Sequence, residues 1–266
     1  MPCHGATITT SSNPVELVQA ILGEGVSLVG GATIIYSSGD QQGLFGDAYD
    51  LIGIDSGIVL STGRIDGDRI FGPNIAPIES LGMDDGVADI NTDLVGFSLP
   101  ELHAIAGAET FDVNALSFYF SVENDATIYF NFVFASEEYV DHIGAGYNDV
   151  IAFFLDGENM ALINGDPISI NTINPLVNSD YYINNVDTTD GYTSAGRNIR
   201  FDGFTKVLRF EQQVSAGVHR ITIAIADAFD GGVTVQCSFR AAASPHPQLL
   251  RNSQLPPRFR SRLRLL

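Results

Sequence analysis

The sequence predicts an all-β protein, specifically a jelly-roll-like β-sandwich with two short helices. The first observation is strict alternation of apolar and polar residues over short segments, clearest where Ile128, Phe130, Phe132 and Phe134 alternate with their neighbours. The second is that turn-forming residues separate these segments, with 27 glycines among 266 residues. A hydrophobic share of 45% suits the packed core of one large domain.

The two helices are predicted from their start signals. Asn13 can cap the first helix, Pro14 suits its first turn, and Glu16 completes a capping box. Gly23 ends that helix. A second capping box predicts a short helix over residues 98–107.

Strands account for most of the remaining pattern. Strand segments are predicted at 26–36 (two strands around Gly30-Gly31), 51–62, 116–122, 127–134, 150–155, 160–170, 206–212 and 218–226. The turns Asn124-Asp125 and 215–217 indicate β-hairpins. Residues 39–46 and 63–93 are predicted loops, and 171–198 a long surface excursion. The predicted core comprises Phe118, Phe120, Phe130, Phe132, Phe134, Phe153, Ile223 and Ile225.

The charge is strongly negative and uneven. Six arginines and no acidic residues follow position 239, which leaves seven basic against 32 acidic residues in 1–239, a net charge of −25. Such a surface repels nucleic acid and anionic lipid, so we expect neither as a partner. No stretch is long and apolar enough to span a membrane.

The loop between two predicted strands, residues 136–149, gathers oxygen-bearing side chains without a lysine or arginine. The candidate metal ligands are Glu137, Glu138, Asp141, Asn148 and Asp149, with Asp227 or Asp230 as further possibilities. Ca²⁺ prefers six to eight carboxylate, amide and carbonyl oxygens, so calcium is the expected ion. The alternative is a solvated acidic surface with side chains that cap turns.

Two other functions fit single features. Glu137 and Glu138 could be the carboxylate pair of a glycosidase-like hydrolase, although adjacent strand residues point to opposite faces. Tyr181, Tyr182 and Tyr192 could stack on sugars in a glycan-binding, lectin-like module.

Four segments carry a family resemblance: GIDSGIVLSTG (53–63), FVFASEEYVDHIGAGYNDVIAFFLDG (132–157), FDGFTKVL (201–208) and GVHRITIAIADAFD (217–230). Together they resemble the choice-of-anchor L family of bacterial surface proteins. The resemblance implies an exported, all-β, cell-surface domain whose C-terminal anchor varies between members, and it implies no established activity. The expected domain boundaries are therefore a disordered N-terminal segment (1–12), a choice-of-anchor L-like domain (13–230) and an aberrant basic tail (231–266).

The tail is expected to be out of frame. After Asp230 the chain loses its acids and its alternation and gains Arg and Pro. Codons exist for 235–248 that, shifted by one base, encode Ser-Val-Phe-Ile-Gln-Gly-Gly-Ser-Phe-Thr-Thr-Pro-Pro, which resembles the closing strand of the family. Codons for 258–263 likewise permit Val-Pro-Leu-Pro-Ala, similar to a sorting signal. We therefore expect that a frame slip has removed the anchor.

The N-terminus shows no signal-peptide pattern, so the start is expected to have been assigned too late. With only Cys3 and Cys237, neither a disulfide framework nor a cysteine metal site is expected. We conclude from the sequence that this is a non-enzymatic, secreted or surface-anchored β-sandwich with a matrix or adhesion role. Its partner would be a polysaccharide or protein of the cell surface or matrix.

Overall fold

The computed structural model describes residues 6–35, 37, 41–63, 65, 99–140, 142–186, 191–197, 199 and 201–228, together with the backbone of 235–245. The described helices are α1 (Pro14–Ile21), α2 (Tyr49–Ile52) and α4 (Pro100–Ala106), with a 3₁₀ turn at Ser179–Tyr181. The described strands are β1 (Thr7–Thr10), β2 (Ser27–Ile35), β3 (Gln42–Gly46), β4 (Gly57–Ser61), β5 (Thr110–Val122), β6 (Ala126–Ser136), β7 (Val150–Leu155), β8 (Glu158–Asn159), β9 (Leu162–Ile163), β10 (Asp166–Pro167), β11 (Tyr182–Asn184), β12 (Gly203–Thr205), β13 (Leu208–Val214), β14 (Gly217–Ala228) and β15 (Val235–Pro245).

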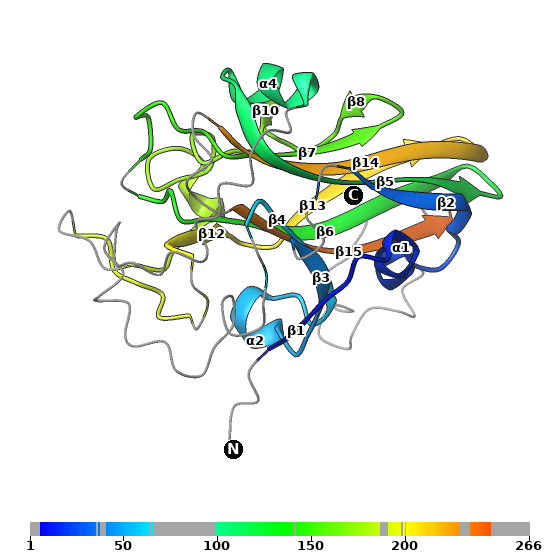
Figure 1. Cartoon of the computed structure of the whole chain (residues 1–266), viewed down its shortest axis with the longest axis horizontal. Coiled ribbons are helices and arrows are strands. Elements are labelled where there is room, and N and C mark those ends of the chain that lie inside the picture. Colours follow the sequence, from blue (N-terminus) through cyan, green and yellow to red (C-terminus); the bar gives the residue numbers. More distant parts are fainter. Residues whose placement is uncertain are drawn as a thin grey trace, which may run out of the picture.

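These strands form two stacked antiparallel sheets (Figure 1). The larger sheet has the order β1-β3-β4-β15-β6-β12-β11, and β13 pairs with the same edge of β6 as β12. The smaller sheet has the order β2-β5-β14-β7-β8, and β9 and β10 form a separate small hairpin. The prediction of an all-β sandwich is therefore confirmed.

The two predicted hairpins are wrong. β5 pairs with β2 and β14, whereas β6, which follows it after a short turn, pairs with β15, β12 and β13 in the other sheet. β13 and β14 are separated in the same way. Alternation predicts which side chains face the core, and a turn motif predicts where the chain reverses. Neither says whether the next strand returns beside its predecessor or crosses to the facing sheet.

Four local predictions also change. Residues 27–35 form one strand, β2, with a register irregularity between Val29 and Ala32 rather than a turn. The predicted loop 39–46 contains β3, and the predicted strand 51–62 overlaps a third helix, α2, before β4 begins. The N-terminal segment, for which we predicted disorder, contains β1.

The first helix forms at the predicted position, but without the predicted capping box: the carboxylate of Glu16 accepts a hydrogen bond from the Ser11 hydroxyl, and the backbone amide of Asn13 donates to that same hydroxyl at 3.2 Å. The side chain of Asn13 accepts hydrogen bonds from the backbone amides of Val15 (3.1 Å) and Glu16 (3.4 Å), so it caps α1. The apolar stripe of α1, including Leu17 and Ile21, is buried.

The predicted core residues are all buried between the two sheets. Phe132 of the large sheet contacts Phe153 of the small sheet, with ring centroids 4.8 Å apart. Phe130 and Phe210 stack at 5.9 Å on neighbouring strands. Aromatic contacts between and within the sheets therefore hold the centre of the sandwich together.

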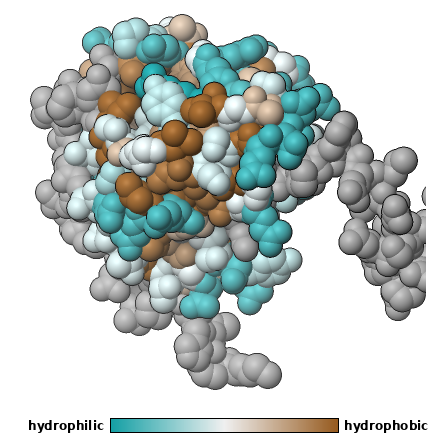
Figure 2. Space-filling model, turned by 90° about the vertical axis from the view of Figure 1, so that its right-hand side faces the viewer, coloured by the Kyte–Doolittle hydropathy of each residue, from teal (hydrophilic) through white to brown (hydrophobic). Residues whose placement is uncertain are grey.

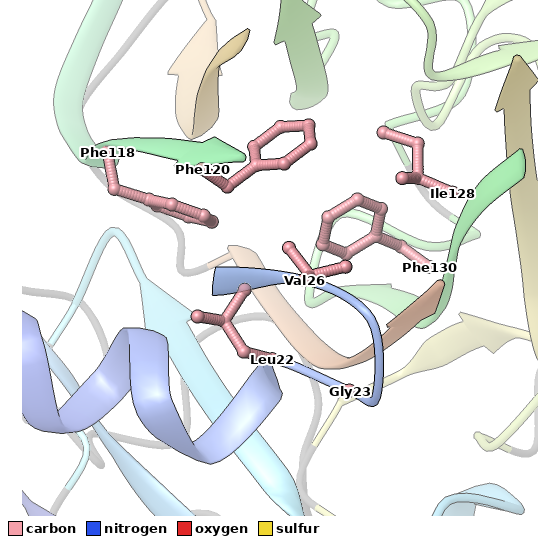
Figure 3. Close-up of a pocket in the computed structure, with 7 residues that line it drawn as sticks. All are labelled: Leu22, Gly23, Val26, Phe118, Phe120, Ile128 and Phe130. Atoms are coloured by element: carbon pink, nitrogen blue, oxygen red, sulfur yellow. The ribbon is translucent and has the colours of Figure 1, made fainter. Parts of the chain in front are cut away.

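One end of the sandwich is apolar. Figure 2 shows apolar residues gathered in the middle of this end, inside a polar rim. In Figure 3, Phe118 and Phe120 of β5 and Ile128 and Phe130 of β6 lie around Leu22 and Val26, next to the end of α1. The hollow between them has a free volume of about 10 Å³, room for about one water molecule.

The predicted basic tail also contains a strand. β15 lies between β4 and β6, in the middle of the large sheet, with Phe239 in register with Phe132 and Cys237 with Phe134. No described helix has the length and hydrophobicity needed to cross a membrane.

Candidate functional site

At the end of the sandwich away from the apolar hollow, inward-facing positions become polar. Along β14, Ile221, Ile223 and Ile225 belong to the core, and Asp227 follows them near the end of the strand. Asp149 immediately precedes β7, and Ser136 ends β6. The end of the core thus meets a layer of polar side chains drawn from both sheets.

Four carboxylates of this layer, which we call the carboxylate cluster, are buried. Their side chains belong to Asp112 (3% exposed), Glu138 (1%), Asp149 (1%) and Asp227 (3%). The charges of the other three all act on Asp227, so the four lie close enough to interact. Carboxylates in such surroundings lose hydration and repel one another when they are ionised.

Hydroxyl groups fix the cluster's position. The Ser136 hydroxyl donates to Oδ2 of Asp149 at 2.7 Å and accepts from the backbone amide of Glu138 at 2.9 Å. The Thr62 hydroxyl, just after β4, hydrogen-bonds Asp227. On the solvent side, Nδ1 of His142 lies 3.7 Å from Oε2 of Glu138.

An amide side chain ties this layer to the large sheet. Nδ2 of the fully buried Asn114, in β5, donates to the carbonyl oxygens of Gln41 (3.0 Å) and Ser61 (3.1 Å). These bonds join β5 of the small sheet to the ends of β3 and β4, so the polar layer also links the two sheets.

Burial changes the acidity of this layer. Burial, followed by the charge of Asp149, raises the pKa of Asp227 well above its ordinary value, although the hydrogen bond from Thr62 opposes the shift. Burial, followed by the charges of Tyr182 and Asp149, raises the pKa of Tyr139. Asp227 therefore holds a proton at pH values where a solvated aspartate is ionised.

Segments that carry the family resemblance meet beside this layer. Gly203, from FDGFT, pairs with Ser136, and the Thr205 hydroxyl accepts from the backbone amide of Phe134 at 3.0 Å. A Cβ at Gly203 would lie 2.8 Å from Cβ of Tyr139 and 2.6 Å from the Tyr182 hydroxyl, so only glycine fits without displacement. The motif residues therefore position one another at this end of the sandwich.

The predicted metal ligands have different surroundings in the structure. Glu138 and Asp149 belong to the buried cluster. Asn148 instead donates to the carbonyl of Ala106 at 2.9 Å and accepts from the backbone amide of Asn171 at 3.3 Å, so it joins two loops. Glu137 is half-buried, and Asp141 lies outside the described residues, as does Asp230.

Sequence reasoning named Asp227 only as a secondary possibility and missed Asp112. The available signal was an aspartate at an inward position of an otherwise apolar strand, as in Ile221-Thr-Ile-Ala-Ile-Ala-Asp227. In the described part of the chain, no group of three or more His, Cys, Asp and Glu side chains is arranged to hold a metal ion.

The three tyrosines do not form one exposed platform. Tyr181 is 38% exposed, whereas Tyr182 packs on Tyr139 with ring centroids 4.8 Å apart and donates to Asn184 at 3.0 Å. Burial, followed by the charge of Asp202, raises the pKa of Tyr182 above its ordinary value. Tyr192 is half-buried.

Comparison with known proteins identifies the family. The fold and site define an acidic, all-β sandwich module. The choice-of-anchor L domain model matches residues 6–240, so the chain belongs to this family. Membership indicates an exported protein of the bacterial cell surface.

No curated protein matches the sequence. Two solved structures that do match are of β-glucosidase from Kluyveromyces marxianus, one selenomethionine-labelled and one in complex with glucose. Both are 11% identical to this chain, with TM-scores of 0.24 and 0.25. The matches cover 54% and 59% of this chain but only 12% and 13% of the enzyme, and likeness at this level carries no argument about activity.

Proposed function

We propose that this chain is a non-enzymatic module of the bacterial cell surface with a matrix or adhesion role, and that Ca²⁺ bound at the carboxylate cluster stabilises its fold. Family membership supports the location. The cluster supports the ion, because it brings four buried acids close together.

The burial of the four carboxylates is the observation that carries this proposal. An ionised carboxylate that is withdrawn from water is costly unless a counter-charge or hydrogen bonds compensate. Protons supply that compensation at low pH, as the raised pKa of Asp227 indicates. At neutral pH a divalent cation would supply it instead, and it would bind the folded chain far better than the unfolded one.

The residues present fit calcium better than a transition metal. The cluster provides only oxygen donors, which hard cations prefer. In the described residues, no three acidic or histidine side chains are arranged to hold a metal ion. The ion would therefore be bound by only two carboxylates, those of Asp149 and Asp227. The hydroxyl oxygens of Ser136 and Thr62, and water, would complete its shell.

Thermal melts of the purified protein test the proposal. Relative to excess chelator, millimolar Ca²⁺ is expected to raise the melting temperature, because ligand binding to the folded form alone stabilises it. Asp149→Ala and Asp227→Asn should each abolish most of that rise. Asp166→Asn, which removes a charge at an exposed position of β10, should keep it. An unchanged midpoint, or a rise that survives both cluster variants, contradicts calcium binding here.

A glycan-binding role is the second candidate, and Tyr181 supports it. This ring lines a groove of about 640 Å³ between β13 and the β9–β10 hairpin, where a sugar could stack on it. A carbohydrate array, repeated with Tyr181→Ala, distinguishes a lectin-like module from a purely structural one. The hydrolase alternative has weaker support, because Glu138 is buried and neither Glu137 nor Glu138 lines the groove.

A further inference from the structure

The large sheet ends in an open strand edge. One edge of β13 pairs with β6, from Leu208 opposite Phe132 to Val214 opposite Ala126. Among the described residues no strand pairs with its other edge, which borders the 640 Å³ groove. An open edge presents backbone donors and acceptors on which another strand can pair.

Apolar side chains are exposed around this groove. Leu162, Tyr181 and Val207 line it and are 45%, 38% and 39% exposed. Next to them, Leu176 and Val177 are 77% and 45% exposed, and a hydrogen bond of 2.8 Å between Asn164 and Asn178 holds their loop beside the β9–β10 turn. Five of the eight large apolar side chains exposed in the described chain thus lie on this side, as expected of an interaction surface.

The charges on β13 indicate what pairs with it. Arg209 and Glu211 lie on the solvent face, 50% and 53% exposed, with Nε 2.6 Å from Oε1. The guanidinium of Arg209 lies 4.0 Å from the centroid of the Tyr129 ring, which helps to fix its position. The strand therefore presents one positive and one negative charge two residues apart.

The two charges on β13 are self-complementary when this strand pairs antiparallel with a second copy of itself. If β13 pairs antiparallel with β13 of a second copy about a two-fold axis at Phe210, each Arg209 lies opposite Glu211 of the other copy. If the axis lies at residue 209, Arg209 faces Arg209 of the other copy. If it lies at residue 211, Glu211 faces Glu211 of the other copy. Opposite charges across a strand pair stabilise it and like charges destabilise it, so only the Phe210 register is favoured.

We propose that two copies of this chain associate through their β13 edges in this register. The two large sheets then form one continuous sheet, with four alternating charges on its outer face. The apolar side chains beside each groove lie next to the joint and become covered by the second copy.

Charge exchange tests the proposal. Sedimentation of the full chain should show a dimer, and Arg209→Glu or Glu211→Arg alone should weaken it on the order of tenfold or more, because each faces like charges in the new pair. An equimolar mixture of the two variants should dimerise again. In a mixed pair, one copy carries two negative charges on β13 and its partner carries two positive charges, so opposite charges face each other. Arg220→Glu, the same charge change on the small sheet, should remain dimeric.

Circular dichroism of each variant shows whether it is folded. A chain that is monomeric at all concentrations overturns the proposal. So do single variants that dimerise like the parent, or a mixture of folded variants that stays monomeric.

Discussion

Among the described residues, Phe132 makes the closest aromatic contact between the two sheets. Its side chain is 1% exposed, its ring meets Phe153 at 4.8 Å, and its backbone pairs with both β13 and β15. Alternation in the sequence was enough to predict this residue as core, because period two assigns faces without knowledge of partners. The polar neighbours of the core were harder to predict, because nothing local marks Asp112 as buried.

Phe132→Ala is expected to lower the free energy of unfolding by about 3–5 kcal/mol, because it removes a buried aromatic side chain and leaves a cavity. Chemical denaturation measures the change. Tyr119→Ala is the matched control, since Tyr119 is an aromatic residue 49% exposed on β5, and it should change stability by about 0.5 kcal/mol or less. Equal losses for both variants would contradict the assignment of Phe132 to the core.

At the scale of elements, the sequence revealed strands and their faces but not their partners. The turn at Asn124-Asp125 was recognised, yet β5 and β6 lie in different sheets. Pairing between distant segments, such as β15 with β6, depends on the whole fold and leaves little trace in a local pattern. The helix start at Asn13 was predictable because its cap is entirely local.

β15 is the element on which the proposed frame slip depends. Its register places Val235, Cys237 and Phe239 opposite Ser136, Phe134 and Phe132. Contrary to the expectation that alternation ends at Asp230, Val235, Cys237 and Phe239 alternate in the sequence with the polar residues Gln236 and Ser238. This pattern is compatible with a strand between β4 and β6. The proposed shifted frame, Ser-Val-Phe-Ile-Gln-Gly-Gly-Ser-Phe, supplies more β-branched and aromatic residues, which strands favour.

Sequencing of the gene is expected to show a one-base difference near the codons for Gly231-Gly232. A protein with the restored frame should melt at a higher temperature than the chain described here, because the central strand would then match its neighbours better. Genomic DNA that encodes 231–266 as printed, or a restored strand that lowers the melting temperature, contradicts the proposal.

At the scale of the whole molecule, the sandwich is chemically asymmetric. Its interior is apolar at the end near α1 (Figures 2 and 3) and acidic at the end where β6, β7 and β14 bring Ser136, Asp149 and Asp227 together. Both sheets contribute to the acidic end, so we expect the protonation of its carboxylates to affect the unfolding of the entire domain. This dependence links the proposed calcium site to pH.

The direction in which stability changes with pH follows from the raised pKa of Asp227. Its pKa in the folded chain lies well above the value of 3.8 expected when it is unfolded. Between the two pKa values the folded state holds a proton that the unfolded state has lost. The stability contributed by this proton is complete below pH 3.8 and is lost as the pH rises through the folded pKa.

In excess chelator, the contribution of Asp227 should therefore make the melting temperature fall as the pH is raised from below 3.8 to above the folded pKa. Calcium should offset the fall because the ion replaces the proton, so the shift caused by Ca²⁺ should be larger at the higher pH. Asp227→Asn removes the titrating group and should flatten both trends, whereas Asp166→Asn should leave them intact. A calcium shift that is the same at both pH values, or a pH trend that persists in Asp227→Asn, would show that Asp227 does not couple protons to the ion.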